Sequence, residues 1–122
     1  MKEGVFFDMI KSFTAAIRGF LLAIKTERNM KIHIALAIGV LYLSLWLQLI
    51  RFEMAIIWLC IAMVIGAELI NTSIEKLCDK VEPKQSEAIK NVKDMAAGAV
   101  LFISLCAAIV GMYIILPKLL VI

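Results

Sequence analysis

The chain has 122 residues, of which 63% are hydrophobic and 19% are charged, and its mean hydropathy is +0.97. A soluble domain has about half apolar residues and about a quarter charged ones, so this composition leaves too little polar surface to cover a soluble core. The net charge of +3 is small and spread along the chain, which argues against nucleic acid as a partner. The composition predicts a single integral membrane domain over residues 1–122.

Residues 1–29 have the pattern of an amphipathic helix. Their apolar residues recur at steps of three and four, which places them on one helix face; these are Phe6, Ile10, Phe13, Ile17, Phe20 and Ile24. A stripe of cations lies roughly 120° away and consists of Lys11, Arg18 and Lys25. Aromatic groups beside evenly spaced cations predict a helix that lies in the lipid headgroup layer. Packing against a soluble partner is the alternative interpretation.

Long apolar segments follow, and we expect them to lie within helices at residues 30–49, 54–75 and 86–116. Glu68 is the one acid well inside the second segment, and the third carries no charge from Met95 onward. At ~1.5 Å per residue each segment reaches roughly 30 Å, the thickness of the hydrocarbon layer. The sequence therefore predicts an all-α protein with three transmembrane helices. Three buried soluble helices are disfavoured, because so short a chain has nothing polar to bury them.

The basic residues predict the orientation in the membrane. Residues 1–31 hold six Lys and Arg residues and residues 76–93 hold five, whereas the first connection offers Arg51 and the end of the chain Lys118. By the positive-inside bias, the N-terminus and the second connection are expected in the cytoplasm and the C-terminus outside.

The second connection contains a proline, Pro83, which ends one helix and starts the next. The sequence therefore predicts a helix that begins near Lys84 to Ser86 and presents unpaired backbone N–H groups there. Such a terminus favours anions, phosphate included, although most helix starts of this kind bind nothing.

Polar side chains share one face of the second predicted span and of its cytoplasmic end. Spacings of three, four and four residues keep them within about 80° of arc; they are Glu68, Asn71, Glu75 and Asp79. Glu68 is expected ~10 Å beneath the cytoplasmic end of the span. A carboxylate inside hydrocarbon costs on the order of 2.5 to 3.5 kcal/mol, so it indicates a functional site. Interhelical hydrogen bonding by Asn71 and a protonated Glu68 is the structural alternative.

This arrangement suits phosphoryl transfer to a lipid hydroxyl at the membrane interface. Glu68 is placed to take the hydroxyl proton as a general base. Glu75 and Glu27 are candidates to hold Mg²⁺ that carries the phosphates of ATP, because this hard cation prefers oxygen ligands. Lys93 and Asp94 would add a phosphate-binding cation and a further acid. The six glycines are scattered singly, so ATP would be bound by helix faces and metal rather than by a glycine-rich loop.

Two segments carry a family resemblance, ELINTSIEKLCD at residues 68–79 and VKDMAAGAV at residues 92–100. They closely resemble the signature of the prokaryotic diacylglycerol kinase and undecaprenol kinase family, and the match extends upstream to residues 11–13 and 27–29. The resemblance implies a homotrimer in the bacterial cytoplasmic membrane, in which each subunit has three spans and a surface helix and the sites are shared between neighbours.

The resemblance also implies roles for the site residues. Glu68 would be the base, Glu27 and Glu75 would bind the Mg²⁺ of ATP, and Asn71 would lie near the transferred phosphoryl group. The residues beside the nucleotide would be Asp79, Lys84, Ser86, Lys93 and Asp94.

The predicted function is transfer of the γ-phosphate of Mg-ATP to a membrane lipid alcohol. Glu27-Arg28-Asn29 with His33 resembles the undecaprenol kinase branch more than the diacylglycerol kinase branch. Undecaprenol is therefore the favoured acceptor and diacylglycerol the alternative. His33 itself is interpreted as a packing residue at the cytoplasmic boundary of the first span.

Two other classes of protein remain as alternatives. A small proton-coupled transporter would carry its membrane acid alone near mid-bilayer, whereas Glu68 is off-centre and accompanied by Asn71 and Glu75. A non-catalytic assembly subunit would tolerate Glu68→Gln.

Overall fold

The computed structural model describes residues 2–82, 84 and 86–122. All the regular secondary structure in this part of the chain is helical. The helices are α1 (Lys2–Thr26), α2 (Arg28–Trp46), α3 (Arg51–Val81) and α4 (Glu87–Leu119). Three of them, α2, α3 and α4, are long and apolar enough to cross a membrane. The predicted all-α fold with three membrane-length helices is confirmed. The predicted break at Pro83 lies outside the described residues.

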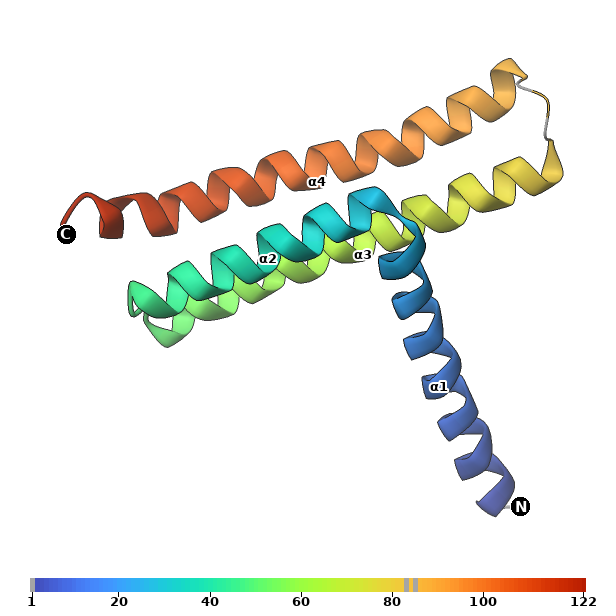
Figure 1. Cartoon of the computed structure of the whole chain (residues 1–122), viewed down its shortest axis with the longest axis horizontal. Helices are drawn as coiled ribbons and strands as arrows, with labels where there is room; N and C mark the ends of the chain where they lie inside the picture. The colour runs from blue at the N-terminus through green and yellow to red at the C-terminus, as the bar shows by residue number, and fades with distance from the viewer. Residues whose placement is uncertain (1, 83, 85) are drawn as a thin grey trace.

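The three long helices lie alongside one another as a row in which α3 contacts both α2 and α4 (Figure 1). The central helix α3 runs antiparallel to both of its long neighbours, α2 and α4, and packs most extensively against α4. α1 projects away from this row at the start of α2, so the chain has the outline of a letter T (Figure 1). Its contact with the row lies near its C-terminal end, where Ala23 is buried.

The corner between α1 and α2 consists of a single residue, Glu27. Its backbone is extended, with φ −109° and ψ 120°, while its N–H still donates to the carbonyl of Ala23 at 2.9 Å. The helical segment predicted for residues 1–29 therefore ends at Thr26, and the next helix starts at Arg28, two residues before the predicted start at residue 30. The break places the Glu27 carboxylate at the point where the two helices meet.

The long helices differ in their ends from the predicted segments. α2 is shorter at its C-terminal end, whereas α3 and α4 continue as helices beyond the apolar residues. α2 ends at Trp46, three residues before the predicted end at residue 49. α3 has 31 residues and α4 has 33, so at ~1.5 Å per residue both exceed the hydrocarbon layer of roughly 30 Å. Their polar extensions, residues 75–81 and 87–94, lie side by side at one end of the molecule.

Most of the apolar surface of the single chain is exposed. In the most apolar stretch of each span at most 11% of the residues are buried. The fully buried side chains in the described part of the chain are Met30, Ile57 and Ser44. A surface of this kind is unstable in water, so the chain is a membrane protein whose spans are covered by lipid or by other protein.

Candidate active site

Buried polar side chains gather on the C-terminal half of α3. Glu68 is 3% exposed, and Asn71 and Thr72 are each 5% exposed. One turn beyond Asn71, Glu75 accepts a hydrogen bond from Asn71 Nδ2 at 3.3 Å. The structure thus brings together three members of the predicted polar face. The carbonyl oxygen Oδ1 of Asn71 and the hydroxyl of Thr72 have no hydrogen-bond partner among the described residues.

Unpaired buried polar atoms of this kind cost about 1–3 kcal/mol each. Their position next to a buried carboxylate is typical of a binding site whose ligand supplies the missing partners. The polar face of α3 is therefore a candidate ligand site, and not only a packing surface.

Glu68 has a partner on the neighbouring helix that the sequence interpretation left out of the site. The Nε2 atom of His33 on α2 lies 3.7 Å from Oε2 of Glu68. In the folded chain the two residues lie at a matching depth. His33 lies roughly 9 Å along α2 from Glu27, and Glu68 roughly 12 Å along α3 from Lys76. Since Glu27 contacts Lys76, the antiparallel helices place the two residues at the same level.

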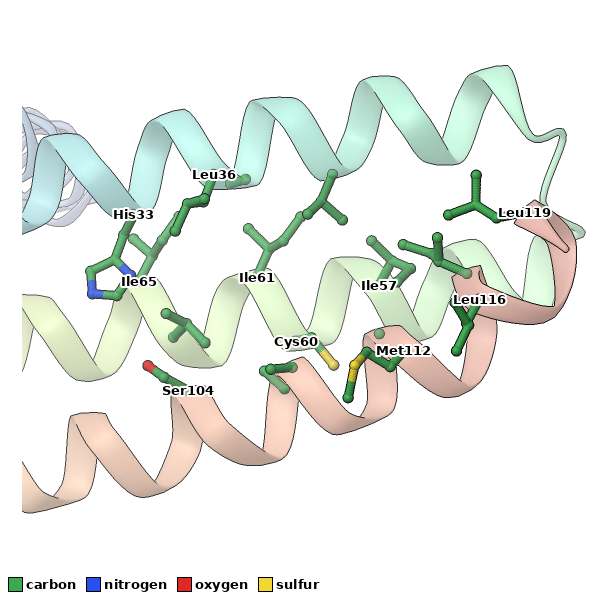
Figure 2. Close-up of a pocket in the computed structure, with 17 residues that line it drawn as sticks. His33, Leu36, Ile57, Cys60, Ile61, Ile65, Ser104, Met112, Leu116 and Leu119 are labelled. Atoms are coloured by element: carbon green, nitrogen blue, oxygen red, sulfur yellow. The ribbon is translucent and has the colours of Figure 1, made fainter.

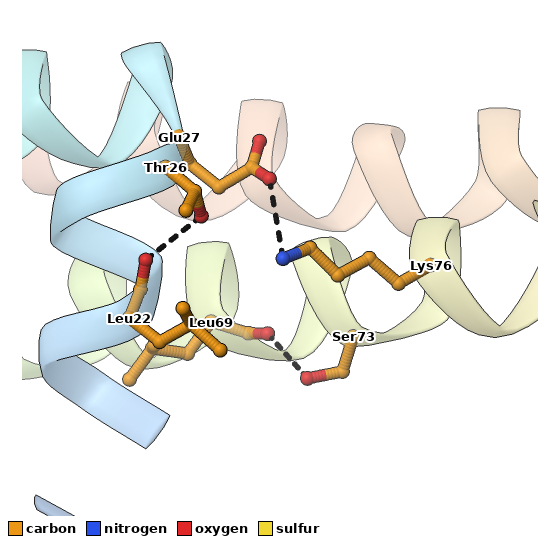
Figure 3. A network of polar contacts seen from close by, with 6 residues as sticks. All are labelled: Leu22, Thr26, Glu27, Leu69, Ser73 and Lys76. Atoms are coloured by element: carbon orange, nitrogen blue, oxygen red, sulfur yellow. Dashed lines mark hydrogen bonds and ion pairs between the residues drawn. The ribbon is translucent and has the colours of Figure 1, made fainter. Parts of the chain in front are cut away.

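The corner residue Glu27 is held against α3 by Lys76, as Figure 3 shows. Nζ of Lys76 lies 3.7 Å from Oε1 of Glu27. Nearby, the Thr26 hydroxyl donates to the Leu22 carbonyl at 2.8 Å and terminates α1. Both acidic candidates for metal binding, Glu27 and Glu75, act electrostatically on Glu68 and so lie near the same carboxylate. Lys76 is a second site residue that the sequence interpretation missed.

The polar extensions of α3 and α4 are joined by an ion pair. Nζ of Lys93 donates to Oδ1 of Asp79, and this hydrogen bond raises the pKa of the Lys93 ammonium group, which lies outside the apolar part of α4. Within α4, Nζ of Lys90 donates to Oδ2 of Asp94 at 2.7 Å. Two residues predicted beside the nucleotide, Asp79 and Lys93, thus contact each other, and Asp94 pairs with Lys90.

The remaining predicted residues lie at the start of α4. The hydroxyl of Ser86 accepts the backbone N–H of Ile89 at 3.2 Å and caps the helix, so α4 begins at Glu87 as its predicted start near Lys84 to Ser86 anticipated. Lys84 is exposed in the connection. The middle of the predicted turn, Gln85, lies outside the described residues.

An apolar cavity of about 410 Å³ opens between α2, α3 and α4 (Figure 2). It extends from His33 at one end to Leu119 at the other. Its α3 wall, which includes Ile61 and Ile65, lies on the same helix face as Glu68 by the 3.6-residue period. The Ser104 hydroxyl on α4 lines this cavity and has no partner among the described residues. The cavity therefore leads from the far end of the spans to His33, whose Nε2 atom lies 3.7 Å from the carboxylate of Glu68.

The described residues contain no group of three or more His, Cys, Asp or Glu side chains that would hold a metal ion alone. The titratable groups that act on Glu68 are His33, Glu75 and Glu27. A pair of carboxylates suits Mg²⁺ that arrives with phosphates, since this ion keeps several waters and takes one or two carboxylates beside its substrate oxygens.

Comparison with known proteins identifies the family. A family model described as "Prokaryotic diacylglycerol kinase" matches residues 14–115. The chain belongs to this family. It is 40% identical over 109 residues to the undecaprenol kinase of Bacillus subtilis (strain 168), a match that covers 89% of each chain. It is also 36% identical over 114 residues to the diacylglycerol kinase of Synechocystis sp., covering 93% of this chain and 65% of the relative.

Membership of the prokaryotic diacylglycerol kinase family confirms the lipid kinase predicted from the sequence. It favours this activity over the transporter and over a non-catalytic subunit. Every candidate site residue, from Glu27 to Asp94, falls inside the segment that the family model matches. The family also implies ATP as the phosphate donor.

Proposed function

We propose that the chain phosphorylates undecaprenol with ATP at the cytoplasmic face of a bacterial cytoplasmic membrane. One observation carries the proposal. The buried carboxylate of Glu68 lies 3.7 Å from His33, which lines the apolar cavity, and it also interacts electrostatically with two further carboxylates, Glu27 and Glu75. A lipid alcohol has the matching form, a long apolar tail with one hydroxyl at the polar boundary.

Glu68 acts as the general base in this reaction. Its carboxylate takes the proton of the lipid hydroxyl while the lipid oxygen bonds to the γ-phosphorus of ATP. The bond between that phosphorus and the oxygen bridging to the β-phosphate breaks, and ADP leaves. The low exposure of Glu68 keeps water away from the reacting phosphoryl group, so transfer to lipid prevails over hydrolysis.

Glu27 and Glu75 are the proposed ligands of Mg²⁺. When bound, the ion would neutralise charge on the phosphate oxygens. Glu75 is held in place by the Asn71 amide, whereas Glu27 must first part from Lys76. The same Asn71 side chain is suited to contact the transferred phosphoryl group from the α3 side.

The polar extensions of α3 and α4 are the proposed nucleotide site. The residues assigned to it are Asp79, Lys84, Ser86, Lys93 and Asp94. Lys93 and Lys84 supply cations for the phosphates. Since Asp79 and Lys93 already pair, binding of the triphosphate would draw the Lys93 ammonium from the aspartate toward the more highly charged ligand.

The cavity between the spans is the proposed site of the prenyl chain. Its lining is almost entirely apolar, and it ends beside the His33 and Glu68 pair. Among the relatives, the match to the undecaprenol kinase of Bacillus subtilis covers both chains almost completely. Diacylglycerol, the substrate that the name of the Synechocystis relative gives, is the alternative acceptor.

A homotrimer is proposed as the active form. The site of the single chain lies along the row of helices, and Asn71 Oδ1 has no hydrogen-bond partner among the described residues, so neighbouring copies are needed to enclose the site. Within each copy, α1 is proposed to lie in the headgroup layer. The N-terminus and the connection between α3 and α4 would be cytoplasmic, with the C-terminus outside.

A side-by-side assay tests the proposal. The purified protein is given Mg-ATP with undecaprenol or with diacylglycerol in the same detergent. We expect faster transfer to undecaprenol, and we expect Glu68→Gln to abolish transfer while leaving the size of the oligomer unchanged. Equal or reversed rates would favour diacylglycerol, and no transfer to either lipid would remove the proposed reaction.

A further inference from the structure

The contact between His33 and Glu68 joins a residue within two turns of the polar start of α2 to one that is almost completely buried. The side chain of His33 is 19% exposed, whereas that of Glu68 is 4% exposed. The distance between Nε2 and Oε2 is 3.7 Å, slightly longer than a hydrogen bond. Catalytic hydrogen bonds are often this long before substrate binds.

A buried base has to lose its proton after every turnover. Once Glu68 has taken the hydroxyl proton, it is a neutral carboxylic acid with little direct access to water. The next substrate hydroxyl cannot transfer its proton until the carboxylate is restored. Repeated turnover therefore needs a neighbouring group that accepts a proton near neutral pH and reaches solvent.

The other groups around Glu68 fit this task less well. Glu75 and Glu27 also act on it electrostatically. Both are proposed Mg²⁺ ligands, and a carboxylate that binds a cation is a poor proton acceptor. The α4 residues that line the cavity beside His33, such as Ser104 and Ala107, have no titratable side chain. Histidine is the side chain whose ordinary charge change falls between pH 5 and 8.

We propose that His33 is a positioning residue for the base Glu68. The Nε2 atom of His33 accepts the proton that Glu68 has removed, and His33 passes this proton to water at the cytoplasmic boundary. This inference rests on the proposed role of Glu68. In the balanced step, the O–H bond of the protonated Glu68 breaks and an N–H bond forms on neutral His33. The carboxylate is thereby restored, and the imidazolium ion then releases its proton to water.

The test compares the first turnover with later ones in wild type, His33→Gln and Glu68→Gln, by rapid mixing with Mg-ATP and undecaprenol. In His33→Gln, Glu68 has time to ionise before mixing. We therefore expect a first turnover at the wild-type rate, one phosphoryl group per site, followed by a steady state slowed on the order of 100-fold. The KM values for both substrates should change less than about twofold. Added imidazole should restore the steady-state rate of His33→Gln but not of Glu68→Gln.

Two results would overturn the inference. One is a steady-state rate of His33→Gln equal to that of wild type. The other is a slowed first turnover without rescue by imidazole, which would indicate a structural role. Lys118→Gln, at the far end of the spans, is the matched control and should behave as wild type. If Glu68→Gln itself remains active, the proposed function fails independently of His33.

Discussion

Lys76 on α3 and Glu27 at the corner between α1 and α2 form an ion pair, with 3.7 Å between Nζ and Oε1. The pair attaches the α1–α2 corner to the helix that carries Glu68. It also occupies one of the carboxylates that we propose for Mg²⁺. The ammonium group of Lys76 and the metal ion therefore compete for the same oxygen atoms.

Removing this competitor should strengthen magnesium binding. In Lys76→Met, the Glu27 carboxylate no longer has to leave an ion-pair partner before it binds Mg²⁺. Exposed ion pairs contribute about 0.2–1 kcal/mol of stabilisation. We expect the Mg²⁺ concentration for half-maximal kinase activity to fall by up to about fivefold at fixed ATP. A magnesium titration checks this. Lys80→Met, on the next turn of α3, is the control and should leave the titration unchanged. A higher magnesium requirement in Lys76→Met would contradict the proposed role of Glu27.

The pair of Asp79 with Lys93 gives a prediction for ATP. Lys93→Met should raise the KM for ATP about tenfold, the effect of losing one charge-assisted phosphate contact of about 1.4 kcal/mol, and should leave the KM for undecaprenol unchanged. Lys90→Met removes a lysine of the same helix that pairs with Asp94 and should have a smaller effect. Steady-state kinetics with each substrate varied in turn separates the two outcomes. An equal rise in both KM values would argue against a nucleotide role for Lys93.

The same pair predicts a dependence on pH. Because the hydrogen bond from Lys93 to Asp79 raises the pKa of the ammonium group, Lys93 stays charged through the ordinary lysine range near pH ~10.4. The pair thus stabilises the fold below that range, and its contribution is lost only as the pH rises through the higher folded-state pKa. In Asp79→Asn the contribution is absent. Thermal unfolding from pH 8 to 11 should show the difference in melting temperature between wild type and Asp79→Asn shrinking at the alkaline end.

The helices and the polar face of α3 were predictable because both depend on local sequence. Charge-free runs mark the spans, and the spacing of Glu68, Asn71 and Glu75 fixes their shared face whatever packs against it. The helix ends were less predictable. Residues 75–81 are polar but favour helix, so α3 continues to Val81 beyond the apolar segment.

Contacts between helices could not be read in the same way. The pairing of Glu68 with His33 depends on how α2 and α3 are aligned along their axes, and hydrophobic periodicity gives the facing sides but not that alignment. The same holds for Glu27 with Lys76, which depends also on the break of a single residue after Thr26. The sequence interpretation consequently identified the acids but missed two of their basic partners.

The end of the spans far from Glu68 offers a test of stability without a change in the site. Glu53 accepts the backbone N–H of Ile50 at 3.1 Å and lies 3.5 Å from Lys118 of α4. Glu53→Ala removes both interactions and should lower the unfolding free energy by about 1–2 kcal/mol, mostly through the lost cap. Lys118→Ala should cost less than about 1 kcal/mol. Thermal unfolding in detergent measures both losses of stability. A larger loss for Lys118→Ala than for Glu53→Ala would contradict the assignment of most of the stabilisation to the helix cap.

The apolar cavity gives a prediction that separates the lipid from the nucleotide. Gly111 on α4 lines the cavity, and a Cβ atom added there meets no other atom within 4 Å. Gly111→Leu should therefore fold and project its side chain into the space proposed for the prenyl chain. We expect the KM for undecaprenol to rise about tenfold, equivalent to about 1.4 kcal/mol, while the KM for ATP stays the same.

Gly39→Leu is the matched control for this substitution. Gly39 lies on α2, is not among the residues that line the cavity, and has equally open space around an added Cβ atom. It should leave both KM values unchanged. If Gly111→Leu binds undecaprenol normally, the prenyl chain lies elsewhere, for example against the exposed faces of the spans. If it raises both KM values, the substitution disturbs the helix packing that positions Glu68, because a blocked cavity by itself leaves the nucleotide site intact.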